Sequence, residues 1–206
     1  MIIIIRLLER RFEIIVVLCG KSCTGKDRVR EKLCGERKEY KYKKMISYTT
    51  RPMRSGEKNG VDYWFINNEE MDFLRNKGYI LDYREYKVSG GDIWRYGHFN
   101  NDKDVFKNEI YIAIADLDGA KTFKEAYGDD CIVIYIEAPY YQRRARANIR
   151  DDNKKEIERR FKQDDIDFSN EKLYNIIDFS VENLDGYLNE TVDVIINYIE
   201  NIRKER

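Results

Sequence analysis

The sequence predicts an α/β fold in which a parallel sheet is flanked by helices. Three apolar runs rich in β-branched residues predict buried strands, at Ile14–Leu18, Ile110–Ile114 and Cys131–Ile136. Segments of helical character follow the first two of these strands. Because strands that alternate with helices and are buried on both faces are typical of parallel sheets, we expect these three runs to share one sheet.

The two helical segments have recognisable ends. Asp27 to Cys34 is followed by Gly35, and Leu117 to Tyr127 is followed by Gly128. Glycine is common directly after the last turn of a helix, because it adopts the left-handed conformation found there. Each segment is therefore predicted as a helix that ends at its glycine.

The middle of the chain has a different pattern. Short strand-like segments at Met45–Tyr48, Val61–Ile66 and Tyr79–Tyr86 are separated by polar turns. Asn68 to Asn76 lies between the last two and has the apolar spacing of a helix. We expect an antiparallel α+β insertion within the parallel core.

The last third of the chain is predicted to be helical. Tyr140 to Phe168 is strongly basic and then mixed in charge, which is typical of solvated helices. Leu184 to Ile199 carries apolar residues on one helical face, so it is predicted to close the fold as an amphipathic helix.

Composition restricts the classes of function. At 206 residues the chain fits one compact domain with small inserted parts. The 38 Lys and Arg residues balance 38 Asp and Glu residues, which argues against a globally cationic nucleic-acid binder. The N-terminal residues lack the pattern of a signal peptide, and no apolar run approaches the ~20 residues of a membrane span. We expect a cytoplasmic protein that binds neither nucleic acid nor membrane.

The cysteines do not suggest a metal site. Four cysteines occur without CxxC spacing, and the chain has one histidine, His98. Structural zinc sites usually draw their four ligands from paired cysteines and histidines. We therefore interpret the cysteines as reduced thiols.

The first chemical motif is Gly20-Lys-Ser-Cys-Thr-Gly-Lys-Asp27. It fits the phosphate-binding pattern GxxxxGK[ST] except at its last position. Such a loop turns successive backbone N–H groups toward phosphate oxygens, while its lysine and the following helix N-terminus add positive potential. Its position between a buried strand and a helix favours an ATP-binding loop over a chance turn. The predicted ATP-binding residues are Gly20, Lys21, Ser22, Cys23, Thr24, Gly25, Lys26 and Asp27.

Asp27 departs from the pattern, since a Ser or Thr hydroxyl at this position normally ligates Mg²⁺. A carboxylate can hold Mg²⁺ directly or through water, and it suits the N-terminus of a helix. Asp27 is therefore the candidate Mg²⁺ ligand.

The second motif extends from Ser47 to Phe65 and reads SYTTRPMRSGEKNGVDYWF. Arg51 and Arg54 lie three positions apart around a proline, and Tyr63 follows a polar turn. Arginine binds phosphate through two parallel N–H donors, and a tyrosine hydroxyl adds a neutral donor. These three residues predict an anion clamp.

Together the two motifs resemble the guanylate kinase family. The segment Ser47–Phe65 is similar to its GMP-binding signature, and the resemblance covers roughly Phe12 to Glu200. It implies a P-loop NTPase-type sheet with a GMP-binding insertion and a helical lid. The implied organisation is a single domain at 12–205, with a core (12–44, 99–139 and 169–205), an insertion (45–98), a lid (140–168) and an N-terminal extension (1–11).

The resemblance also implies GMP ligands. Arg51, Arg54, Tyr63 and Tyr96 match ligands of the GMP phosphate, and Ser47, Asp82, His98 and Asp116 match residues near guanine. Asp82 stands where the family has glutamate, and Glu85 is the alternative if the register differs. His98 replaces a serine or threonine beside guanine O6; an imidazole N–H can donate there, and the alternative is a loop histidine that faces solvent.

A third group of residues is basic. Arg146 and Arg150 are four positions apart, which places them on one face of a helix. The resemblance implies that these two and Arg160 close over the ATP phosphates; a solvated basic face is the alternative. With Lys26 and Arg51 they are the predicted catalytic residues.

The implied reaction is ATP + GMP → ADP + GDP with Mg²⁺, with GMP or dGMP as acceptor, in a monomer or homodimer. Two alternatives stay open. Asp27, Asp82 and His98 are compatible with a kinase for another nucleoside or deoxynucleoside monophosphate. Some relatives are non-catalytic binding modules, although those typically lose the phosphate loop, and this chain retains it.

Overall fold

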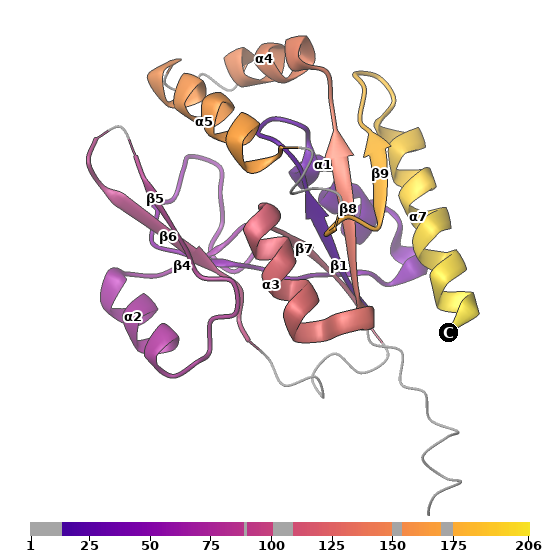
Figure 1. The fold of residues 1–206 in the computed structure, drawn as a ribbon, viewed down its shortest axis with the longest axis horizontal. Coiled ribbons are helices and arrows are strands. Elements are labelled where there is room, and N and C mark those ends of the chain that lie inside the picture. The colour runs from indigo at the N-terminus through magenta and orange to yellow at the C-terminus, as the bar shows by residue number, and fades with distance from the viewer. Residues whose placement is uncertain (1–13, 89, 101–108, 150–153, 170–174) are drawn as a thin grey trace, which may run out of the picture.

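The computed structural model describes residues 14–88, 90–100, 109–149, 154–169 and 175–206. They form a central sheet covered by helices and a second, smaller sheet beside it (Figure 1). The predicted N-terminal extension at 1–11 and the predicted catalytic residue Arg150 lie outside the described residues.

The central sheet has five strands in the order β2-β7-β1-β8-β9, and every neighbouring pair is parallel. The three predicted strands form its middle and confirm the parallel α/β fold. The strands are β1 (Ile14–Cys19), β2 (Lys43–Lys44), β7 (Ile110–Ile114), β8 (Cys131–Glu137) and β9 (Phe179–Glu182).

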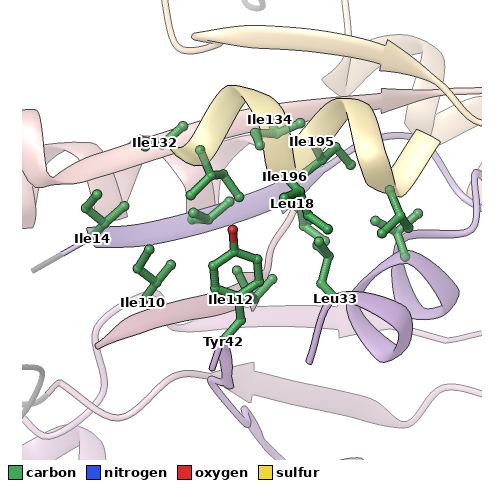
Figure 2. Close-up of a cluster of buried hydrophobic side chains, with 14 of the residues drawn as sticks. Ile14, Leu18, Leu33, Tyr42, Ile110, Ile112, Ile132, Ile134, Ile195 and Ile196 are labelled. Atoms are coloured by element: carbon green, nitrogen blue, oxygen red, sulfur yellow. The ribbon is translucent and has the colours of Figure 1, made fainter. Parts of the chain in front are cut away.

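Helices cover both faces of this sheet, which explains why its middle strands are continuously apolar. On one face, β1 packs through Ile14 and Leu18 against the helix that follows it and against the C-terminal helix, as Figure 2 shows. On the other face, Phe123 of the helix that follows β7 is fully buried. The covering helices are α1 (Lys26–Glu31), α3 (Leu117–Tyr127) and α7 (Leu188–Glu205).

Three short helical turns complete this part of the fold. The first helix is followed by a π-helical turn (Lys32–Glu36) and a 3₁₀ turn (Lys38–Tyr40), and α3 is followed by a 3₁₀ turn (Gly128–Asp130). The predicted helix at 27–34 therefore divides into an α-helical and a π-helical part.

The second sheet has the order β4-β3-β6-β5. It is mixed rather than antiparallel as expected, because β3 and β4 run in the same direction while the pairs β3–β6 and β5–β6 are antiparallel. Its helix begins with a capping box between Asn67 and Glu70, in which each side chain accepts from the other residue's backbone N–H. The elements are β3 (Tyr48–Thr49), β4 (Trp64–Phe65), α2 (Asn68–Asn76), β5 (Arg84–Lys87) and β6 (Ile93–Gly97).

The segment predicted to be helical after β8 contains two helices, α4 (Tyr140–Ile149) and α5 (Lys154–Asp167). Figure 1 shows both beyond the end of the central sheet toward which the β8 arrow points. Among the helices that the structure describes, none combines the length and apolar composition that a membrane span requires.

Candidate functional site

A cavity of about 680 Å³ lies at the carboxyl ends of the central strands. Ligands of open parallel α/β sheets bind at this edge. The first loop, the second sheet and α5 all contribute to its wall, so residues from distant parts of the sequence meet there. The predicted site residues that line it are Gly20, Ser22, Cys23, Lys26, Asp27, Ser47, Arg51, Arg54, Tyr63, Tyr96, Asp116 and Arg160.

The loop from Gly20 to Asp27 connects β1 to α1, as its motif predicts. Gly20 has φ +151°, and a Cβ on it would lie 2.3 Å from the carbonyl oxygen of Ile136. Gly25 has φ +93°, and a Cβ there would lie 2.4 Å from Nδ2 of Asn183. Both positions therefore require glycine for conformation and for space.

Lys26 reaches back over this loop. Its Nζ donates to the carbonyl oxygens of Gly20 at 2.5 Å and Lys21 at 2.9 Å. Burial of the ammonium lowers its pKa, which the negative charges of Asp27 and Asp164 oppose. The loop thus holds one positive charge at the cavity wall, between its own backbone and the open space.

Asp27 occupies the first turn of α1 and is exposed. Its Oδ1 lies 4.0 Å from Nη2 of Arg30, one turn further along the helix. Arg30 is 5% exposed and also lines the cavity. The motif did not single out Arg30, although its spacing of four from Lys26 places both on one helix face.

The predicted anion clamp is held in place by Glu57. Arg51 is buried, and its Nη2 donates to Oε1 of Glu57 at 2.7 Å, while the other carboxylate oxygen of Glu57 accepts from the backbone N–H of Arg54 at 2.7 Å. The Arg51 guanidinium lies 5.3 Å from the ring centroid of Tyr63, which in turn contacts Tyr96 at 6.1 Å between centroids. Burial and the nearby Asp27 raise the pKa of Tyr63 to about 12, so its hydroxyl stays a donor.

Asp116 follows the end of β7 by two residues and directly precedes α3. Its Oδ1 accepts from the backbone N–H of Gly119 at 2.9 Å, which makes Asp116 the N-cap of the helix. Its other oxygen accepts from the hydroxyl of Tyr86. Nη1 of Arg84 lies 3.3 Å from Oδ1. Arg84 and Tyr86 also line the cavity, and neither was predicted.

Asp82 and His98 do not line the cavity. Asp82 is 2% exposed and His98 is completely buried. Nδ1 of His98 lies 2.9 and 3.0 Å from the two oxygens of Asp82, whose Oδ1 also accepts from the His98 backbone N–H at 2.6 Å. The alternative of a solvent-facing histidine is therefore wrong. Glu85 is exposed on β5, pairs with Arg95, and does not line the cavity either.

The lid arginines lie in different places. Arg146 is absent from the cavity wall and contacts the outside of the phosphate loop, with Nη1 donating to the carbonyls of Cys23 at 3.3 Å and Thr24 at 3.1 Å. Its Nη2 pairs with Asp185 at 2.7 Å. Arg160 does line the cavity, with Nε donating to Glu156 at 3.0 Å.

Lys21, Thr24 and Gly25 are the loop residues that do not line the cavity. Lys21 donates to Asp165 of α5 at 2.8 Å, and the buried Thr24 hydroxyl donates to the carbonyl of Lys21 at 3.1 Å. Lys21 therefore connects the loop to α5, while Thr24 closes a turn within the loop.

The sequence did not indicate a second set of residues from α4 and α5. Asp164 accepts from the Ser22 backbone N–H, and Arg143 lies 3.3 Å from the same carboxylate; Arg159 lines the cavity beside Arg160. In a segment of alternating charges, a buried carboxylate cannot be distinguished from its solvated neighbours by residue type alone.

Comparisons with known proteins agree with this geometry. The family model described as guanylate kinase matches residues 13–201. The guanylate kinase of Anaplasma phagocytophilum (strain HZ) is 31% identical over 188 residues, which cover 90% of this chain and 85% of that protein. The guanylate kinase of Malacoplasma penetrans (strain HF-2) is 30% identical over 177 residues, covering 84% and 86%.

The fold is similar to a solved structure as well. A crystal structure of guanylate kinase from Anaplasma phagocytophilum superposes with a TM-score of 0.67 and 25% identity, covering 93% of this chain and 86% of that one.

Proposed function

We propose that this chain, which belongs to the guanylate kinase family, transfers the γ-phosphoryl group of ATP to GMP and releases ADP and GDP. One observation carries the proposal: the phosphate loop and the Arg51–Tyr63 clamp line the same cavity. Phosphoryl transfer requires two bound anions in line and positive charge around the group that moves. A cavity lined by both proposed anion sites and by cationic side chains supports both requirements.

The loop Gly20–Asp27 is the proposed ATP site. Its backbone N–H groups would bind phosphate oxygens, and Lys26 would exchange its carbonyl contacts for the β- and γ-phosphates. Arg160 from α5 lies on the cavity wall and would neutralise charge on the transferred group. Arg146 supports the loop from outside in this structure, so we assign it a positioning role.

Arg51, Arg54, Tyr63 and Tyr96 are the proposed site for the GMP phosphate. Glu57 accepts from the Arg51 side chain and from the backbone N–H of Arg54, so the clamp would be preformed before the ligand binds. The exposed Arg54 side chain is free to fold onto the phosphate. Bidentate arginine contacts fix the direction of the attacking phosphate oxygen as well as its charge.

The donor set near Asp27 fits Mg²⁺. Mg²⁺ usually keeps several waters and binds one or two carboxylates together with substrate phosphates. Asp27 lines the cavity beside the phosphate loop, and its carboxylate is exposed. In the described part of the chain, no group of three His, Cys, Asp or Glu side chains forms a cage for a metal. Asp27 would therefore hold Mg²⁺ that ATP brings with it, and the ion would neutralise phosphate charge.

The remaining parts of the proposal concern organisation. We assign residues 45–98 as the GMP-binding insertion and 140–168 as a lid whose closure excludes water from the cavity. The cytoplasmic location and the monomeric or homodimeric state stay predictions. The alternative of a kinase for another nucleoside monophosphate was based partly on Asp82 and His98. It is weakened because neither residue lines the cavity.

The decisive experiment measures ATP- and Mg²⁺-dependent phosphorylation of GMP, dGMP, AMP, CMP and UMP in parallel. We expect strong preference for the guanine nucleotides. Faster turnover of another base would reassign the acceptor, and the absence of turnover with retained GMP binding would favour a binding module.

A further inference from the structure

Arg84 has an unusual place for a charged residue. It is the first residue of β5, and the alternation of that strand places Arg84 and Tyr86 on one face while Glu85 and Lys87 are exposed on the other. The face that carries Arg84 lines the cavity beside Ser47 and Asp116. The Arg84 side chain is 15% exposed, so it is largely enclosed.

The surroundings hold the guanidinium in one orientation. Its Nε donates to the backbone carbonyl of Asp82 at 3.1 Å, its Nη2 lies 2.9 Å from Oδ2 of Asp82, and its Nη1 lies 3.3 Å from Oδ1 of Asp116. A guanidinium has five N–H donors. The Nε donor is engaged by a hydrogen bond, and each η nitrogen, with two N–H groups, forms one ion pair, so these contacts leave at least one donor on each η nitrogen.

Two η donors on a residue that lines the cavity would favour a particular base. Guanine presents O6 and N7 as adjacent acceptors, which arginine binds with two N–H groups. Adenine presents an amino group in place of O6, which opposes an arginine donor. The ionised carboxylate of Asp116 is adjacent to Arg84 and lines the cavity, and its oxygen that accepts from Tyr86 has room for one further donor, such as an N–H group of guanine. Burial opposes this ionisation, but Arg84 and the donors from Tyr86 and Gly119 hold the pKa of Asp116 below its ordinary value.

Asp82 is buried away from the cavity, and both of its oxygens contact protein groups. One of its oxygens accepts from the His98 backbone N–H, the other pairs with Arg84, and both lie within 3.0 Å of Nδ1 of His98. Neither Asp82 nor His98 lines the cavity, whereas Arg84 does. Their arrangement fixes the position of the arginine rather than presenting a group to the ligand.

We infer that Arg84 is the residue that reads the guanine base, by donating to O6 and N7, and that Asp82 with His98 positions it. This inference rests on the proposed function, since it concerns the acceptor site of that reaction. The sequence predicted that Asp82 contacts the base. The inference assigns that contact to Arg84 instead, which Asp82 and Asp116 hold in place.

The test combines a change in the ligand with a change in the protein. In 7-deaza-GMP, a C–H group replaces N7 and removes one acceptor. The wild-type protein and the Arg84→Met and Arg84→Lys variants are compared for KM and calorimetric Kd with GMP and with 7-deaza-GMP. Arg95→Met is the matched control, because Arg95 forms ion pairs with Asp72 and Glu85 in the same sheet but does not line the cavity.

For the wild type and Arg95→Met, we expect 7-deaza-GMP to bind on the order of 10-fold more weakly than GMP. For Arg84→Met the two ligands should bind equally, with GMP weakened on the order of 10- to 100-fold. Arg84→Lys retains charge without the two-donor fork, so it should also lose most of the discrimination. Such non-additivity is evidence of direct contact.

Equal binding of the two ligands by the wild type would overturn the inference, and so would a preference for GMP that persists in Arg84→Met. The wild-type comparison needs no variant to fold. If Arg84→Met unfolds, the double variant Arg84→Met with Asp82→Asn removes the unpaired buried charge. The proposed function fails separately, through wild-type protein that does not phosphorylate GMP.

The positioning role has its own measurement. Asp82→Asn should retain Arg84 at the cavity but loosen it, so the ratio of GMP to 7-deaza-GMP affinity should fall toward one. A merely structural role for Asp82 would lower the free energy of unfolding and leave that ratio unchanged, and this result would overturn the positioning assignment.

Discussion

The carboxylate of Asp164 is hydrogen-bonded to Ser22 in the phosphate loop. One oxygen accepts from the Ser22 backbone N–H at 2.8 Å and the other from the Ser22 hydroxyl at 3.1 Å. The two residues are 142 positions apart in the chain, so this contact attaches α5 to the loop. It also places negative charge at an N–H group that ATP phosphates would need.

Asp164→Ala is therefore expected to lower the KM for ATP several-fold, because it removes an anion that competes for the loop N–H and repels phosphate. Initial rates at varied ATP and saturating GMP give the value. Asp165→Ala is the matched control, since Asp165 lies on the same helix and its exposed carboxylate contacts Lys21 instead. An unchanged or higher KM for ATP in Asp164→Ala would contradict the expectation.

Lys26→Ala should reduce kcat on the order of 10²-fold or more, because it removes a preorganised positive charge beside the transferred group. The KM for GMP should change little, since the clamp residues are intact. Lys32→Ala controls for general loss of charge, because Lys32 forms an exposed pair with Glu36 away from the cavity wall. Turnover near the wild-type rate would remove Lys26 from the mechanism.

Arg51→Lys is a sharper test of the clamp than Arg51→Ala. Lysine retains the charge but cannot contact Glu57 and a phosphate with parallel donors. We expect both substitutions to raise the KM for GMP by 10-fold or more and to lower kcat, with lysine recovering only part of the loss. Arg75→Ala, on α2 over the Tyr83 ring, should behave as the wild type. Full activity in Arg51→Lys would show that charge alone suffices.

Gly20→Ala should destabilise the protein by about 1–3 kcal/mol, because the new Cβ meets a backbone oxygen and the residue has positive φ. Urea denaturation followed by circular dichroism measures the free energy of unfolding. Gly35→Ala is the control, since a Cβ there meets no atom within 4 Å. Equal stability of the two variants would show that the loop can move away from Ile136.

The lowered pKa of Asp82 predicts how the stability of the folded state depends on pH. Burial alone would raise its pKa, but His98 and Arg84 hold it well below the ordinary value of 3.8. The ionised carboxylate therefore stabilises the folded state above that value, and this contribution is lost as the pH falls through the lowered pKa. Asp82→Asn should be less stable at pH 7, and its difference from the wild type should shrink below pH 4. Asp129→Asn, which is exposed, should show no such change.

The parallel core could be predicted from the sequence because its strands are buried on both faces. The strand Ile110–Ile114 and the helix Leu117–Tyr127 have the predicted limits. β2 has two residues, and β9 alternates between half-buried and exposed positions, so neither gives a continuous apolar run. Strand β6 was missed for the same reason, since its residues are only partly buried before Gly97.

The site could be predicted where a loop conformation or a turn fixes the residues. The phosphate loop and the clamp are encoded by local spacing, and both reach the cavity. Asp82 and Arg84 are two positions apart, and which of them lines the cavity depends on how β5 pairs with β6 and contacts Asp116 before α3. Residue type alone could not distinguish a carboxylate that contacts a base from one that holds an arginine.

The hydrogen bonds that hold the phosphate loop from outside the cavity affect the conformational entropy that the loop loses when ATP binds. Arg146 and the Asn183 side chain both donate to the carbonyl of Thr24, at 3.1 and 2.8 Å, so elements far along the chain determine the curvature of the loop. A loop that is already curved loses little conformational entropy when a ligand arrives. More of the binding free energy is then available for holding the triphosphate in line with its acceptor.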